Sequence, residues 1–314
     1  MMDKHGMTPL MHAAWKGTES MLSYLLKQDT LFILFDFRML LEAGAKAYHI
    51  NSVNRTAAAM AAFVGNHECV SVINNFVPKD DVWYYTRLQP LEDEPKLPAK
   101  LAHPLYKMVM SMNTHPVRIS MIVRADPLLL ENLDKVTAVL ELMSDKEFKH
   151  RYDVNEILSL KFHMIKYILK VTKFEKILIF CTKIFFRRFP VHQENFLRQG
   201  IKEFPFPEST LFKMLVTNFS HCKTYGEGQT AAEYINGAFN GQKGFKDYEN
   251  CGTCGEEKAE KKCTACKSIS YCNQDCQKLH WFMHKKFCKS LREAFDKREK
   301  EAKESEKLEK KEEK

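Results

Sequence analysis

The stretch CGTCGEEKAEKKCTACKSISYCNQDCQKLHWFMHKKFC, residues 251–288, decides the fold of the C-terminal part of the chain. It contains four closely spaced pairs of metal-type ligands. The pairs are Cys251 with Cys254, Cys263 with Cys266, Cys272 with Cys276, and His284 with Cys288. Such spacing lets one turn of backbone offer two donors to one ion, and two pairs complete a tetrahedral Zn²⁺ site. Eight ligands therefore predict two zinc ions.

Other uses of these ligands are less well supported. A disulfide framework needs an oxidising compartment, and the N-terminus shows no apolar segment typical of a secretory signal. A catalytic zinc keeps one coordination position open, whereas eight ligands fill two sites completely. His280 and His284 have the spacing of a metalloprotease helix, but Trp281 stands where the general-base Glu belongs. We therefore predict structural zinc and no catalytic residues.

The order and spacing of the ligands resemble the MYND-type zinc finger, most closely from Tyr271 onward. A RING finger would end in a Cys-x2-Cys pair, which is absent from this stretch. The resemblance implies a cross-brace, in which the pairs interleave. It assigns the first ion to Cys251, Cys254, Cys272 and Cys276, and the second to Cys263, Cys266, His284 and Cys288. The one rival ligand is His280, and choosing it would leave Cys288 unpaired.

The same resemblance implies that the finger binds short proline-containing peptides. Gln277 and Trp281 occupy positions similar to the peptide-contacting ones, although packing of Trp281 against the zinc-bound loops is an equal alternative. Residues 251–288 hold seven Lys and four acidic residues. Seven thiolates bound to two Zn²⁺ contribute three further negative charges, so that the net charge is near zero. Nucleic-acid modules concentrate positive charge, and we therefore expect no nucleic-acid partner.

A second pattern opens the chain and recurs once. Thr8-Pro9-Leu10 can cap and begin a helix, since Pro is tolerated at the first helical position. The spacing of Thr8, Ala13, Ala14 and Gly17 returns as Thr56, Ala61, Ala62 and Gly65. Residues 1–77 resemble ankyrin repeats, with an unrelated helical bundle as the alternative.

The two copies are separated by an unusual distance. Thr8 and Thr56 are 48 residues apart, whereas two ankyrin periods of 33 would separate them by 66. The missing residues fall between Thr30 and Met39, where the middle repeat should have its own turn and first helix. We therefore expect an incomplete middle repeat that packs poorly at residues 27–42.

The regions between the repeats and the finger are less distinctive. Residues 78–104 contain five prolines and an acidic run, which predict an extended linker. Residues 105–225 have mainly helical patterns, including a helix from Ser209 to Phe219. The glycine-rich residues 226–250 predict a flexible lead-in to the finger. Residues 289–314, rich in Lys, Glu and Arg, predict a charged tail, either a solvated helix or disordered, without a core of its own.

Residues 149–188 carry ten Lys or Arg and three acidic residues. Ile157, Leu160 and Met164 lie on one helical face, with Lys161 and Lys166 elsewhere on the helix. This pattern predicts the solvated rim of a helical domain. Contact of this basic helix with an acidic membrane surface is the weaker alternative.

The chain has a formal net charge of +8, 45% hydrophobic residues and ten cysteines. Outside the finger, Cys69, Cys181 and Cys222 are scattered, as expected for a reducing cytosolic protein. The longest apolar runs are far shorter than the roughly 20 residues that span a bilayer. We therefore expect a soluble, cytoplasmic protein.

Together the patterns predict a mainly α protein with ankyrin-like repeats, a helical middle region, a small cross-brace finger and a charged helical tail. This order resembles the ankyrin repeat and MYND domain protein family. The resemblance implies a non-enzymatic adaptor with two Zn²⁺ ions and protein partners, in trafficking of signalling proteins, with the cilium as a possible site. A SET-type lysine methyltransferase is disfavoured, because most of that catalytic domain follows the finger and 26 residues follow Cys288. A transcriptional corepressor is a further alternative, which fits the finger, but the sequence shows no basic face that would bind DNA.

Overall fold

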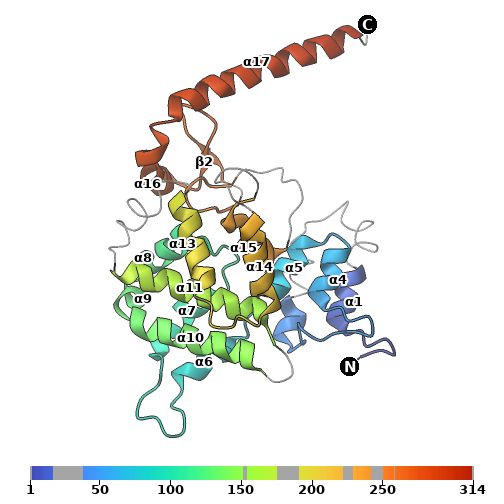
Figure 1. Cartoon of the computed structure of the whole chain (residues 1–314), viewed down its shortest axis with the longest axis vertical. Helices are drawn as coiled ribbons and strands as arrows, with labels where there is room; N and C mark the ends of the chain where they lie inside the picture. The colour runs from blue at the N-terminus through green and yellow to red at the C-terminus, as the bar shows by residue number, and fades with distance from the viewer. Residues whose placement is uncertain are drawn as a thin grey trace. The chain divides into compact units, whose positions relative to one another are not determined.

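The computed structural model describes residues 2–16, 38–150, 154–174, 191–221, 229–241, 250–257 and 259–312, with tail side chains up to residue 301. Its contacts divide the chain into two compact units. The first unit, residues 1–177 and 194–244, is built of packed helices. The second, residues 178–193 and 245–314, contains the predicted finger and tail. The mainly helical fold class is confirmed (Figure 1).

The two N-terminal copies begin with the same cap. Thr8 precedes α1 (Pro9–Lys16), and its side chain accepts a hydrogen bond from the backbone N–H three residues later, at 3.2 Å. Thr56 caps α4 (Ala57–Phe63) in the same way, at 3.1 Å. Satisfying an otherwise unpaired N–H of the first turn stabilises a helix by about 1 kcal/mol. The repeated Thr therefore marks the repeated helix start, as predicted.

The chain just before each of these two helices folds into a turn that is organised by one side-chain oxygen. The carboxylate of Asp3 accepts hydrogen bonds from the backbone N–H groups two and four residues later, at 2.8 and 2.9 Å. The amide oxygen of Asn51 does the same at 3.1 and 2.9 Å. Asp3 and Asn51 are 48 residues apart, the same distance as Thr8 and Thr56. This correspondence was missed in the sequence because the two residue types differ.

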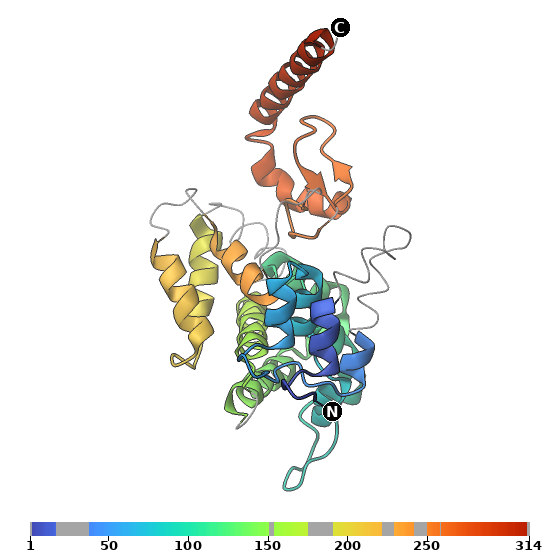
Figure 2. The same cartoon turned by 90° about the vertical axis from the view of Figure 1, so that its right-hand side faces the viewer.

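The two copies are direct neighbours. The backbone N–H of Ser52 donates to the carbonyl of His5 at 3.0 Å, α1 packs against α4, and α4 packs against α5 (His67–Asn75) (Figure 2). Residues 38–42 are helical, and Leu41 is buried in the same core. That core is made chiefly of Leu10, Met11, Ala14, Ala57, Met60, Ala61 and Ile73. The predicted poor packing at residues 27–42 lies mostly outside the described residues.

Residues 78–104 do not form the extended linker that we predicted. They contain short helical elements of the first unit: α6 (Lys79–Trp83), η1 (Tyr84–Thr86), η2 (Ala99–Leu101) and the start of α7 (Ala102–Val109). The prediction is wrong because prolines here begin helical turns: Pro78 is the N-cap of α6 and Pro98 that of η2. The fixed φ of proline suits a helix start. Leu97 and Leu101 are fully buried and hold the segment on the core.

The middle region is helical, as predicted. After α7 its helices are α8 (Pro116–Ala125), α9 (Pro127–Glu131), α10 (Leu133–Lys149), α11 (Glu156–Phe174), α13 (Val191–Lys202) and α14 (Thr210–His221). α14 begins one residue after the predicted Ser209, whose hydroxyl accepts the N–H of Phe212 at 3.1 Å. A core between α11, α13 and α14 includes Phe204 and Phe206, both buried.

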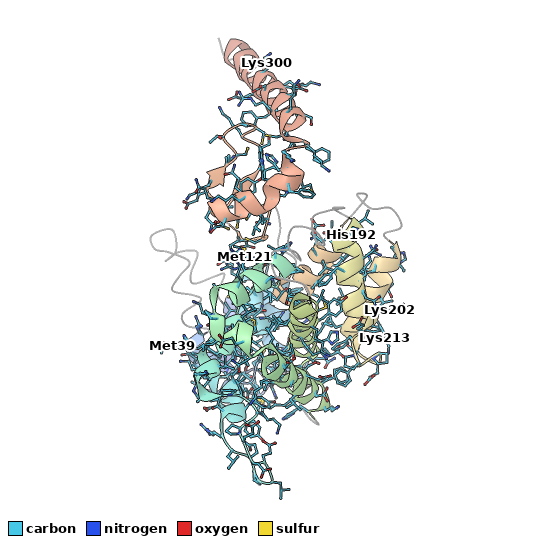
Figure 3. The ribbon with its side chains drawn as sticks, turned by 90° about the vertical axis from the view of Figure 1, so that its left-hand side faces the viewer. Met39, Met121, His192, Lys202, Lys213 and Lys300 are labelled. Carbon is cyan, nitrogen blue, oxygen red and sulfur yellow. The ribbon has the colours of Figure 1, made fainter. Side chains whose placement is uncertain are left out.

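The predicted basic surface helix is in fact the central helix α11, and that prediction is wrong. Lys161 is fully buried and Lys166 is 8% exposed, so neither charge faces solvent. A second apolar stripe runs through the expected polar face, formed by Leu158, Phe162, Ile165 and Leu169, all buried. A helix that is apolar on all sides is a buried helix. The exposed lysines of this part of the chain include Lys202 of α13 and Lys213 of α14 (Figure 3). No helix among the described residues combines the length and apolarity needed to cross a bilayer.

The predicted flexible lead-in at residues 226–250 contains a capped helix instead. α15 (Ala231–Asn240) starts with a capping box: Thr230 accepts from the N–H of Glu233 at 3.2 Å, and the Glu233 carboxylate accepts the N–H of Thr230 at 2.8 Å. α15 packs on α5 and α14. The capping sequence Thr-x-x-Glu was present in the chain, but the surrounding glycines concealed it.

A buried polar network joins α15 to the repeats and to α11. The ammonium of Lys161 donates to the side-chain oxygen of Asn75 at 2.7 Å. The amide of Asn75 donates to the side-chain oxygen of Asn240 at 2.8 Å, and the hydroxyl of Ser71 donates to the same oxygen at 2.9 Å. The amide of Asn240 in turn donates to the carbonyl of Met112 at 3.0 Å. Buried polar groups are costly unless hydrogen-bonded, so this network fixes how the segments dock.

The second unit ends in α17 (Cys288–Glu312), as the sequence predicted for the tail. Its first residue is one of the finger's ligands. Ion pairs one turn apart join Arg292 to Asp296 at 2.9 Å and Lys297 to Glu301 at 3.8 Å. Lys300, labelled in Figure 3, is exposed. Such pairs support a solvated helix by a few tenths of a kcal/mol each.

Burial of Lys161 predicts a pH-dependent stability. Burial lowers the pKa of Lys161 from 10.5 to about 7, so the unfolded chain binds more protons than the folded chain between these pH values. The free energy of unfolding should therefore rise with pH, by on the order of 1 kcal/mol per pH unit between pH 7 and 9. Urea unfolding followed by circular dichroism measures this slope. Lys161→Met should flatten it, whereas Lys170→Met, at an exposed position of α11, should keep it. Equal slopes for both variants would show that Lys161 is not the cause.

Candidate metal centre

The finger is built on a short hairpin and one helix. β1 (Lys261–Lys262) pairs antiparallel with β2 (Ser270–Tyr271), with Lys261 opposite Tyr271. α16 (Gln274–His284) follows at once. Its N-cap is Asn273, whose side chain accepts the backbone N–H of Cys276 at 2.9 Å. These elements place the last four ligands on or beside one helix.

The first two ligand pairs lie in turns of matching geometry. In the first, the N–H of Gly255 donates to the carbonyl of Cys251 at 2.9 Å. In the second, the N–H of Lys267 donates to the carbonyl of Cys263 at 2.8 Å. Both fifth residues have a positive φ, 68° for Gly255 and 57° for Lys267. The tight turn directs both thiols of each pair to one point, which is the arrangement that one ion requires.

Two groups of four ligands result. The first contains Cys251, Cys254, Cys272 and Cys276; the second contains Cys263, Cys266, His284 and Cys288. Within each group the ligand atoms all lie within 4.8 Å of one another. The first and third pairs share one group, and the second and fourth pairs share the other. This is the interleaved arrangement that the resemblance to the MYND finger implied.

The distances within both groups fit zinc. A tetrahedron with Zn–S bonds of about 2.3 Å has edges of about 3.8 Å. The sulfur of Cys254 lies 3.6 Å from that of Cys272 and 3.9 Å from that of Cys276. The Nε2 atom of His284 lies 3.3 Å from the sulfur of Cys263 and 3.6 Å from that of Cys266. These separations are too long for disulfides, whose sulfurs are about 2.05 Å apart.

The electrostatics also favour a bound cation. Burial and the neighbouring thiolate charge of Cys254 raise the pKa of the Cys272 thiol to about 12. With a raised pKa the thiol keeps its proton near neutral pH, and coordination to Zn²⁺ displaces that proton into solvent. Four protein ligands at each site leave no position open for a water molecule, so the ions have a structural role.

The comparisons with known proteins agree with this geometry. The family model described as the MYND finger matches residues 251–288. The Dauer abnormal formation protein 25 of Caenorhabditis elegans is 32% identical over 303 residues, which cover 91% of this chain and 74% of the nematode protein. The chain belongs to the family of that protein. No solved structure matches.

Two further relatives match this chain over little more than the length of the finger. The SET domain and MYND-type zinc finger protein 6 of Schizosaccharomyces pombe is 52% identical over 42 residues, 13% of this chain and 9% of the yeast protein. The zinc finger MYND domain-containing protein 10 homolog of Drosophila melanogaster is 50% identical over 38 residues, 12% of this chain and 8% of the fly protein. The two metal groups match the two zinc ions of a MYND finger, and the finger indicates binding to other proteins.

His280, the rival ligand, has a different role in the MYND finger. It belongs to neither metal group, and its Nδ1 atom lies 3.0 Å from the hydroxyl of Tyr271. Both side chains are buried, Tyr271 almost completely. This pair forms the small core between the two groups. The sequence did not reveal it, nor the hydrogen bond of 2.7 Å from the Thr253 hydroxyl to the carbonyl of Cys276.

The two predicted peptide contacts lie on the solvent side of α16. Trp281 is 47% exposed, and its ring centroid lies 5.9 Å from that of His284. Gln277, one turn earlier, is half-buried. One side of the ring thus packs near a zinc ligand, which is the packing alternative, and the rest faces solvent. Contact of Trp281 with a peptide stays a prediction.

The two histidines allow a matched test of the ligand assignment. Zinc content of the purified chain, measured by inductively coupled plasma mass spectrometry, should be two per chain for the wild type. His284→Ala removes a ligand and should reduce it to about one. His280→Ala removes the hydrogen bond to Tyr271 and should keep two. Two zinc ions in the His284→Ala variant and about one in the His280→Ala variant would show that His280 is the ligand.

Proposed function

We propose that this chain is a protein-binding adaptor without enzymatic activity, whose MYND finger holds peptide segments of its partners against Gln277 and Trp281. The observation that supports this proposal is that one side of α16 is buried and the other is exposed. Its buried residues Cys276, Leu279, His280 and His284 face the metal groups. The half-exposed indole of Trp281 lies on the other side, where nothing in the described finger covers it fully. A large flat ring next to an amide side chain suits a proline-containing peptide in an extended conformation.

The N-terminal repeats supply a candidate second surface. Stacked helix pairs of the kind that resembles ankyrin repeats bind partners over an extended face. Trp15 and Phe63, 42% and 63% exposed, stack with their ring centroids 5.9 Å apart. The guanidinium of Arg55 lies 4.4 Å from the centroid of Phe63. Exposed aromatic and arginine side chains in one place are typical of binding hot spots.

The cellular setting belongs to the same proposal. By its resemblance to the ankyrin repeat and MYND domain proteins, and to the second member of that family in particular, the chain would take part in the trafficking of signalling proteins, in the cytoplasm and at the cilium. The support for location is this resemblance alone, since the name of the nematode relative speaks of dauer formation.

The methyltransferase alternative gains no support from the relatives with SET domains. Their similarity covers 42 or 43 residues of the chain, which is the length of the finger and little more.

The adaptor proposal can be tested by affinity purification of the full chain from cells, with partners quantified by mass spectrometry. Trp281→Ala should lose the partners held by the finger, and Trp15→Ala those held by the repeats, because each removes a large exposed ring at one surface. Lys202→Ala, an exposed residue of α13, serves as the control and should retain all of them. All variants should keep two zinc ions. A partner set unchanged by Trp281→Ala would remove the finger from the proposal.

A further inference from the structure

The exposed side of α16 carries more than Gln277 and Trp281. Lys278 precedes Trp281 by three residues and Lys285 follows it by four, so that the three side chains lie on one helical face. Both lysines are exposed. The indole therefore has an ammonium group on either side along the helix.

Further positive charge and apolar surface adjoin this face. Lys286 and Lys289 are exposed, and the ammonium of Lys286 lies 5.7 Å from the ring centroid of Phe282. Phe282 and Phe287 are 42% and 55% exposed. Across residues 274–289 there are four lysines and one acidic residue, Asp275. The near-zero charge of the whole finger thus conceals a basic helix surface around three exposed aromatic rings.

From this arrangement we infer that the finger selects acidic peptides: a proline-containing segment that packs on Trp281 and places carboxylates within reach of Lys278 and Lys285. The inference rests on the proposed function and adds the chemical class of the partner. Opposite charges beside an apolar contact favour one partner over another and raise the rate of encounter.

A peptide is favoured over nucleic acid or a membrane surface for two reasons. Phosphate-backbone binding takes a stripe of many basic groups, whereas this face offers two lysines, with two more beside it, on a finger of near-zero total charge. The side-chain amide of Gln277 can both donate a hydrogen bond to a peptide backbone and accept one from it. Phosphate groups offer only acceptors, so they would use the N–H groups of this amide but not its oxygen.

The test uses the full chain and three labelled peptides with a common Pro-Leu-Pro centre, flanked on both sides by Glu, Gln or Lys. Fluorescence anisotropy at low salt should give about tenfold tighter binding of the Glu peptide than of the Gln peptide, the effect of two exposed ion pairs. The Lys peptide should bind more weakly than the Gln peptide. Raising the salt concentration should shrink these differences, because the charges are solvent-exposed.

Charge reversal gives the decisive comparison. The double variant Lys278→Glu with Lys285→Glu should reverse the preference, so that the Lys peptide binds tightest. Lys202→Glu with Lys213→Glu changes the total charge equally on α13 and α14, at exposed positions, and should keep the wild-type order. Two zinc ions per chain in each variant establish that the finger is folded.

Each outcome decides a different point. Equal binding of the Glu and Gln peptides would overturn the inference and leave the peptide-binding function standing. Failure of all three peptides to bind would overturn both. If the double variant Lys202→Glu with Lys213→Glu also loses its preference for the Glu peptide, the preference comes from the overall charge of the chain, and the inference is wrong. Tight binding to phosphatidylserine vesicles or to oligo-dT, without discrimination among the peptides, would replace the peptide partner by a phosphate surface.

Discussion

Coordination of two metal ions by seven thiolates and one imidazole is the constraint on which the functional part of this chain depends. A finger of this size cannot bury enough apolar surface to fold alone. Six of the eight ligands are buried, and the large side chains buried beside them are Tyr271, Leu279 and His280. Because Cys276 and His284 both come from α16, the ions also decide which side of that helix faces inward. The same coordination that folds the finger therefore presents Trp281 and its flanking lysines to solvent.

The helical unit depends on a different constraint, the buried network around Asn75. Repeats alone leave one end of their apolar face uncovered. Here α15 packs on α5, and the side chains of Asn75 and Asn240 bond across 165 residues of sequence. The ammonium of Lys161 adds α11 to the same network. An apolar contact tolerates sliding, but a set of buried amides is satisfied in one register only. The repeats, the middle helices and α15 thus form one unit.

The sequence predicted those features whose cause is local. The thiol pairs, the Thr caps of α1 and α4 and the start of α14, one residue after the predicted Ser209, all depend on residues a few positions apart, and the sequence predicted these features. The interleaved ligand groups followed from a resemblance, since spacing alone leaves open which pairs combine. For Trp281 the sequence left two alternatives open, and the structure shows packing of one side of the ring near His284 with the rest of the ring exposed.

The wrong predictions concern segments in which contacts with distant residues decide the structure, and not the local sequence pattern. Lysines at positions 161 and 166 indicated a solvated face, but apolar residues between them bring other helices onto that face. Prolines at 78 and 98 indicated an extended linker, whereas both precede short helical elements, and the buried Leu97 and Leu101 hold the second of these on the core. The glycines around residue 237 indicated a flexible segment, although the capping box of α15 indicated a helix. The helix on which α15 packs, α5, lies far away in the sequence. Such contacts join residues far apart in sequence, which no local pattern encodes.

The eight protein ligands fill both zinc sites, with no coordination position left open. X-ray absorption at the zinc edge on the purified full chain counts the neighbours of each zinc. Seven sulfurs and one nitrogen shared by two ions predict an average of 3.5 sulfur and 0.5 nitrogen neighbours per zinc, with Zn–S bonds of about 2.3 Å. An average of one or more light-atom neighbours per zinc would mean that a water molecule or another group occupies an open position, and would contradict the account.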